Sequence, residues 1–108
     1  MPFLAQDLSI ELVRRLCAPL AIVRQHDPAL ARQLDRAADS VALNLAEAGG
    51  RRGRDRVHLC RIAYGSLREA VCALQLAVAK GWLDGSEPAH AIADRLGGML
   101  YSLAALRR

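Results

Sequence analysis

Two acidic residues stand three positions before a histidine, and this spacing is the strongest candidate for metal chemistry in the sequence. The pairs are Asp55 with His58 and Glu87 with His90. Di-iron bundles use such pairs together with two further glutamates that face inward. Here both pairs fall in the first turn of a predicted helix, where an acid ordinarily complements the helix dipole, and antiparallel helices would hold them at opposite ends. We therefore expect no metal and no other cofactor.

Nucleophilic catalysis needs a thiol or hydroxyl beside a base, and the sequence offers no such arrangement. Its cysteines have no histidine and asparagine at a recognisable spacing, and its helical serines lack the strained turn that exposes a nucleophile. No glycine-rich phosphate loop follows a strand. We therefore predict that the protein is not an enzyme. The odd number of cysteines favours reduced thiols in the cytosol, at Cys17, Cys60 and Cys72.

Arginine residues provide the best functional lead. The chain carries fourteen arginines and one lysine against eleven acids, a net charge of +4. Several arginines cluster around Asp55 and others continue along one helical face through Gly65, which creates a field that attracts phosphates. Such phosphate contacts are independent of base sequence and sensitive to salt. The predicted RNA- or DNA-binding residues are Arg51, Arg52, Arg54, Arg56, Arg61 and Arg68.

A competing interpretation of these arginines is a solvated face neutralised by acids. The protein would then be a scaffold or interaction module with no nucleic-acid role. The sequence offers little for stacking on nucleobases, since its aromatic residues are scattered and mostly placed for packing, at Phe3, Tyr64, Trp82 and Tyr101. A symmetric oligomer would repeat the basic patch once per subunit and multiply weak contacts.

Apolar residues at three- and four-residue steps predict helices. Pro19 removes a backbone donor, so the first helix should bend or break between Cys17 and Pro19. Asp27 followed by Pro28 predicts an N-cap with proline at the first position of the second helix, and the glycines at 49–50 supply left-handed positions that end it. The stripes are Leu8, Leu12, Leu16, Leu20 and Val23, then Leu30, Leu34, Ala37, Val41 and Leu45.

Two further helices follow. One should run from about Arg54 to Lys80 and stop at Gly81, and Ser86 should cap the other, with Pro88 in its first turn. The last stripe comprises Ile92, Leu96, Met99, Leu103 and Leu106. Because short connections force antiparallel packing, we predict an all-α, up-down-up-down four-helix bundle. Its 108 residues form one domain.

The segment from Ala70 to Ala79 contains one polar side chain, Gln75, so this half of the third helix is apolar on every face. A helix in a four-helix monomer normally exposes one face to water. We therefore predict a homo-oligomer that buries the outer face. The alternative is that the alanines and Cys72 on this face are too small to require burial.

Polar residues also recur on one face of the second helix, and such groups must hydrogen-bond if they are buried. We expect a structural polar network with the third helix that fixes helix register, rather than a ligand site. Gly65 and the Gly97–Gly98 pair should permit close approach between helices. The predicted structural network comprises Arg36, Ser40, Asn44, Glu47, Ser66 and Glu69.

Several of these motifs resemble a bacterial four-helix-bundle family first noticed in intervening sequences of 23S ribosomal RNA genes. The likeness covers about residues 8 to 106 and is most specific between Gln33 and Gly81. It is carried by Gln33-Leu34, Arg36-Ala37-Ala38, Ser40-Val41, Asn44-Leu45-Ala46-Glu47 and Gly50-Arg51, and by Ile62-Ala63, Gly65-Ser66-Leu67, Glu69, Leu74, Ala77 and Gly81.

The resemblance implies assembly into a pentameric barrel with a central channel. The accessory variability determinant of diversity-generating retroelements belongs to the same family, and in those members a basic surface engages reverse transcriptase and nucleic acid. This sequence departs from the family pattern at Ala48, where glycine is usual, and at Asp35 and Asp39, which oppose nucleic-acid binding by the second helix.

The first residues, Met-Pro-Phe-Leu-Ala-Gln-Asp, lack the basic and apolar regions of a signal peptide. No run approaches the ~18 apolar residues that a membrane span requires. We therefore expect a cytoplasmic protein that does not contact a membrane.

Overall fold

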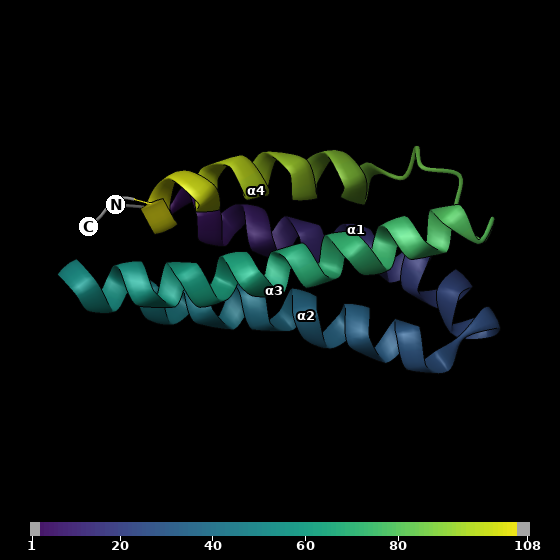
Figure 1. Cartoon of the computed structure of the whole chain (residues 1–108), viewed down its shortest axis with the longest axis horizontal. Coiled ribbons are helices and arrows are strands. Elements are labelled where there is room, and N and C mark those ends of the chain that lie inside the picture. The colour runs from purple at the N-terminus through teal and green to yellow at the C-terminus, as the bar shows by residue number, and fades with distance from the viewer. Residues whose placement is uncertain (1–2, 106–108) are drawn as a thin grey trace.

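The computed structural model describes residues 3–105 and contains four helices: α1 (Leu4–His26), α2 (Pro28–Ala48), α3 (Gly53–Ala79) and α4 (Pro88–Ala105). Each helix packs against the next one along the chain, and α4 also packs against α1. The bundle closed in this way measures 42 × 22 × 19 Å (Figure 1). The predicted all-α, up-down-up-down fold is confirmed.

The core lies between the apolar stripes of the four helices. In α2 the whole predicted stripe is buried, and in α1 all of it is buried except Leu8, which is partly exposed. The stripe of α4 is different: its buried residues are Ala89, Ala93, Leu96 and Leu100. Of the predicted positions, Ile92, Met99 and Leu103 are only partly buried, and Leu106 lies outside the described residues. The reason is that α4 must face both α1 and α3.

The beginning of α2 agrees with the sequence pattern, because the Asp27 carboxylate accepts a hydrogen bond of 3.1 Å from the Leu30 amide. Gly81 has a φ of 81° directly after α3. The end of α2 differs from the prediction: Gly49 has a right-handed φ of −60°, and the left-handed glycine is Gly53, at 59°. The left-handed position therefore lies at the first residue of α3 rather than at the end of α2.

Ser86 does not cap α4 as predicted. Its hydroxyl donates to the Asp84 carboxylate, 2.7 Å away, instead of accepting from the first turn of the helix. Glu87 organises this connection, because its carboxylate accepts from the amides of Asp84 and Gly85, each at 3.0 Å. The connection between α3 and α4 is thus closed by two acidic side chains.

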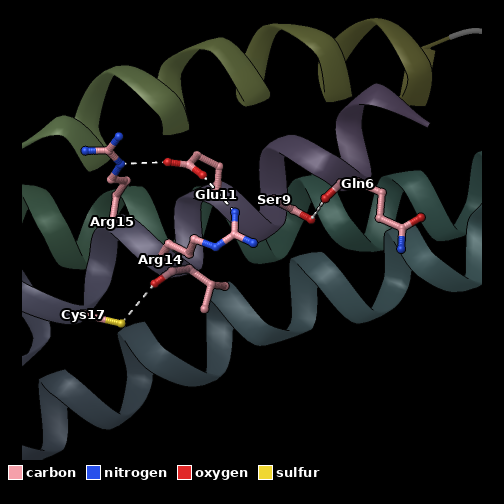
Figure 2. A network of polar contacts seen from close by, with 7 residues as sticks. Gln6, Ser9, Glu11, Arg14, Arg15 and Cys17 are labelled. Carbon is pink, nitrogen blue, oxygen red and sulfur yellow. Dashed lines mark hydrogen bonds and ion pairs between the residues drawn. The ribbon is translucent and has the colours of Figure 1, made fainter. Parts of the chain in front are cut away.

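Pro19 does not break α1, which continues from Leu4 to His26 with Pro19 buried. Proline has no backbone N–H, so one helical hydrogen bond is missing here. Packing against α2 and α4 stabilises the helix across this position. The polar contacts of α1 are local (Figure 2): the buried Ser9 hydroxyl donates to the Gln6 carbonyl at 2.6 Å, and the Cys17 thiol donates to Val13 at 3.6 Å.

By length and composition α3 is apolar enough to cross a membrane, with a mean hydropathy of 1.2 over its best window. It therefore comes closer to a membrane span than inspection of the sequence predicted. Core helices of bundles meet the same criterion, and the stripe of α3 from Leu59 to Ala77 packs between α2 and α4.

Candidate nucleic-acid interface

One end of the bundle gathers most of the predicted nucleic-acid-binding arginines. The end of α2, the start of α3 and the end of α4 meet there (left in Figure 1). We call this the basic end, and it comprises Arg51, Arg52, Arg54, Arg56 and Arg61. All of these side chains are exposed except Arg56, which is partly buried.

Two of these arginines stabilise the fold by donating to carbonyls at the ends of other helices. Arg56 Nη1 donates to the Ala48 carbonyl at 3.2 Å, at the last residue of α2, and its guanidinium lies 4.4 Å from the centre of the Phe3 ring. Arg61 Nε donates to the Ala104 carbonyl at 3.0 Å, in the last turn of α4. Because the final carbonyls of a helix lack internal partners and carry partial negative charge, cations are favoured there.

Arg51 is partly neutralised by acids on the same surface. Its guanidinium forms an ion pair of 2.9 Å with Glu47 and lies 3.8 Å from Asp55. Neither the Arg52 nor the Arg54 side chain forms an ion pair or a hydrogen bond with residues 3–105. The exposed charge of the basic end is therefore concentrated at Arg52 and Arg54, with Arg51 shared between two carboxylates.

The basic face of α3 continues from this end along the helix. Arg54, His58, Arg61 and Arg68 are all exposed, as is Gly65 between them. Arg68 lies 5.9 Å from the centre of the Tyr64 ring. On α2, by contrast, the charges alternate in sign, with the acids Asp35 and Asp39 beside Arg32 and Arg36. Burial raises the pKa of Asp39, and the neighbouring Asp35 adds to this rise. The continuous line of arginines therefore lies on α3.

The aromatic residues are not all scattered, contrary to the expectation from the sequence. Tyr64 on α3 and Tyr101 on α4 meet edge to face, with ring centroids 6.0 Å apart and planes at 63°. Tyr101 is 64% exposed, so it contributes an open ring face rather than core packing. The two tyrosines are 37 positions apart along the chain. Local sequence patterns could not predict their contact, because it depends on how α4 is shifted along α3.

Part of the predicted polar network connects α2 with α3. The hydroxyls of Ser40 and Ser66 lie 2.8 Å apart, and Asn44 Nδ2 donates to the Ser40 carbonyl at 2.8 Å and to its hydroxyl at 3.1 Å. Glu47 instead turns to Arg51 at the surface. Arg36 and Glu69 are exposed, so they lie outside this partly buried cluster. These hydrogen bonds fix the position of α2 along α3. The cluster contains no reactive group.

The glycines do not bring helices together as predicted. A β-carbon added at Gly65 or Gly98 would meet nothing within 4 Å, and one at Gly97 would only reach ordinary contact with Leu67, at 3.7 Å. Gly65 and Gly98 are exposed. Gly97 and Gly98 instead line an open groove between α3 and α4 of about 590 Å³.

The two acid and histidine pairs lie at opposite ends of the bundle, near the starts of α3 and α4. His90 Nε2 lies 2.7 Å from Glu87 Oε1. Within residues 3–105 no three metal-ligating side chains come together. Burial raises the pKa of the Cys60 thiol, an effect that the nearby Arg56 only reduces, so this thiol stays protonated and weakly nucleophilic.

Comparisons with known proteins agree with this fold. No curated protein matches the chain. A crystal structure from Bacteroides thetaiotaomicron, of a protein of unknown function from the S23 ribosomal protein family, superimposes with a TM-score of 0.83 at 20% identity, covering 94% of this chain and 98% of that one. This likeness concerns the fold alone. The sequence profile of the 23S rRNA-intervening sequence proteins matches residues 4–102, and the chain therefore belongs to that family.

Proposed function

We propose that this protein is a non-enzymatic, cytoplasmic, homo-oligomeric bundle that binds RNA or DNA through its basic end. One observation carries the proposal: Arg51, Arg52 and Arg54 are exposed together at the end of the bundle where α2 ends and α3 starts, and among residues 3–105 only Glu47 and Asp55 form ion pairs with any of them. A convergent excess of guanidinium groups favours phosphate oxygens, which accept paired hydrogen bonds from the guanidinium fork.

The position of Arg52 and Arg54 strengthens this proposal. Arg52 is the N-cap residue of α3 and makes no side-chain cap bond, and Arg54 lies in the first turn. The start of a helix carries partial positive charge, so cations there oppose the helix dipole. Neither arginine stabilises the bundle at this position, whereas the phosphates of an external polyanion would bind both.

Oligomerisation is supported by apolar side chains on the outer faces of α2 and α3. Leu43 is 70% exposed, and Ile62 and Leu76 are 40% and 43% exposed. Ile62 and Leu76 share the outward face of α3 with Cys72. Within 70–79, the segment that motivated the prediction, Leu76 is the exposed large apolar residue, so burial of Leu43 contributes as much to the proposed interface.

We further propose a pentamer, from the resemblance to the retroelement accessory protein. By the same resemblance, a protein partner such as a reverse transcriptase would share the basic surface. Five copies would present five basic ends on one particle, and a long strand contacting several of them would bind more tightly than a single copy allows.

Salt titration of RNA binding tests the proposal. Fluorescence anisotropy with a labelled mixed-sequence RNA, between ~50 and ~200 mM salt, should give an affinity that falls steeply with salt. Replacing Arg51, Arg52 and Arg54 by alanine should flatten the slope of log K against log salt by about 2. A matched variant with Arg14, Arg15 and Arg24 changed to alanine loses the same charge from α1 and should keep the slope.

Three results would overturn the proposal in part or whole. Absence of binding at ~50 mM salt would favour the scaffold alternative, in which the arginines serve the fold as Arg56 and Arg61 do. An unchanged slope in the triple variant would move the site away from the basic end. A single-chain mass by sedimentation would remove the oligomer.

A further inference from the structure

The groove between α3 and α4 has the chemistry of a nucleobase-stacking site. Its volume of about 590 Å³ falls within the range of small-ligand sites, ~300–1,000 Å³. Tyr64, Arg68, Gly97, Gly98 and Tyr101 are among the residues that line it. A second hollow of about 330 Å³ continues it toward Glu87 and His90, sharing Val71 and Asp94.

The groove is open because two of its positions have no side chain. Gly98 is exposed, and a β-carbon there would meet nothing within 4 Å. Beside this gap the Tyr101 ring is 64% exposed, and Tyr64 holds it edge to face at 6.0 Å. A flat ligand can therefore lie against the ring of Tyr101 without displacing the core.

Cationic groups flank the tyrosine pair on the same face of α3. Arg61 lies three positions before Tyr64 and Arg68 four positions after it, so the two arginines are about 10 Å apart along the helix. Arg61 uses its Nε on the Ala104 carbonyl and still has four other N–H donors. The face leads from the groove to Arg54 at the basic end. Aromatic rings flanked by arginines are how proteins hold single strands, whose unpaired bases stack while their phosphates meet cations.

Asp94 sets the direction in which a strand would lie. Asp94 lines the groove together with Val71 and Gln75 and stands seven positions before Tyr101 on α4, farther from the basic end. A carboxylate repels phosphate but accepts hydrogen bonds from amino groups of bases. Phosphates are therefore favoured on the side of Arg61 and Arg68, and base edges on the side of Asp94.

We propose that the groove between α3 and α4 binds single-stranded nucleic acid, with an unpaired base stacked on Tyr101 and phosphates on Arg61 and Arg68. This inference rests on the proposed function and adds to it a preference for unpaired strands. Duplexes would use the basic end alone, because their bases are stacked internally and are not available to Tyr101.

Two substitutions in the groove test this inference, with the labelled RNA measured as a single strand and as a duplex with its complement. Tyr101→Ala should weaken single-strand binding at least about fivefold and leave duplex binding within about twofold. Tyr101→Phe keeps the ring and should bind as the unchanged protein does. Gly98→Glu adds a carboxylate at an exposed position where a β-carbon has open space, and it should weaken single-strand binding by a similar factor at ~50 mM salt.

Gln33→Glu is the matched control, because it adds the same charge to an exposed position of α2 that does not line the groove. It should change single-strand affinity by less than about twofold. Helix content and particle mass are measured for every variant. If Tyr101→Ala and Gly98→Glu leave single-strand binding unchanged while the triple arginine variant weakens it, the groove inference is overturned and the basic end remains. If Gly98→Glu alters the particle mass but not RNA affinity, a second copy covers the groove and the inference also fails.

Discussion

The two ends of the bundle use charge in different ways. At the end where α1 meets α2 and α3 meets α4, acids serve the starts of helices: Asp27 caps α2, and Glu87 binds the amides of Asp84 and Gly85 before α4. At the ends of α1 and α3, the His26 ring stacks on the Trp82 ring with centroids 5.0 Å apart, and the Lys80 ammonium lies 5.2 Å from the centre of the Trp82 ring. Charges at this end agree with the helix dipoles.

The basic end follows this rule only in part. Arg56 and Arg61 bind carbonyls at the ends of α2 and α4, whereas Arg52 and Arg54 stand at the start of α3, where an acid would be favoured. The comparison thus distinguishes arginines that stabilise the fold from arginines that do not. The second group is the better candidate for contacts outside the chain.

The largest expected difference is between Arg56 and Arg54. Arg56→Ala removes a hydrogen bond to Ala48 and a contact with the Phe3 ring, so the free energy of unfolding should fall by about 1–2 kcal/mol. Arg54→Ala should change it by less than about 0.5 kcal/mol. Urea denaturation followed by circular dichroism measures both. Equal losses would mean that the basic end is structural throughout.

A smaller effect, of opposite sign, is expected at Arg52. The residue has the extended backbone of an N-cap but no side-chain cap bond. Arg52→Asp should therefore raise the free energy of unfolding by about 1 kcal/mol while weakening RNA binding. Arg52→Asn caps the helix without adding negative charge, so it should stabilise the protein nearly as much and weaken binding less. A loss of stability in both variants would show that Arg52 supports the fold.

The smallest effect concerns Glu87 at the opposite end. Burial alone would raise the pKa of Glu87, but hydrogen bonds from the Asp84 amide, His90 and the Gly85 amide outweigh it and hold the pKa below its ordinary value of 4.5. A carboxyl with a lowered folded-state pKa stabilises the protein above its unfolded-state value, and that contribution disappears as the pH falls through the folded-state pKa.

Glu87→Gln should remove this contribution. Near neutral pH the variant should be less stable by a few tenths of a kcal/mol, and the difference should vanish below the lowered pKa. Thermal unfolding of both proteins between neutral and acidic pH measures this difference in stability. The pKa values of Asp84 and Glu11 are also lowered. Both proteins contain these two groups, so their effects on stability cancel in the comparison. A constant difference across this range would mean that the Glu87 charge is not coupled to folding.

Local sequence patterns were sufficient for the helices and much of the exposed basic surface. The stripe of α2, its cap at Asp27 and the stop at Gly81 all follow from residues within one or two turns of each other. The exposed line of Arg54, Arg61 and Arg68 is equally local, because positions three and four apart share a helical face. The sequence predicted a bend or a break near Pro19, and the helix does not break there, since packing by neighbouring helices overrode a local preference.

Contacts between helices could not be read in this way. The pairing of Tyr64 with Tyr101, the hydroxyl contact of Ser40 with Ser66, and the use of Arg56 and Arg61 on the carbonyls of other helices join distant positions. Each depends on how far one helix is rotated and shifted against its neighbour. The sequence by itself determined which residues lie on each helical face, because that periodicity is a property of one chain segment. Only the tertiary structure decided which faces meet, because packing of all four helices sets their rotation and level together.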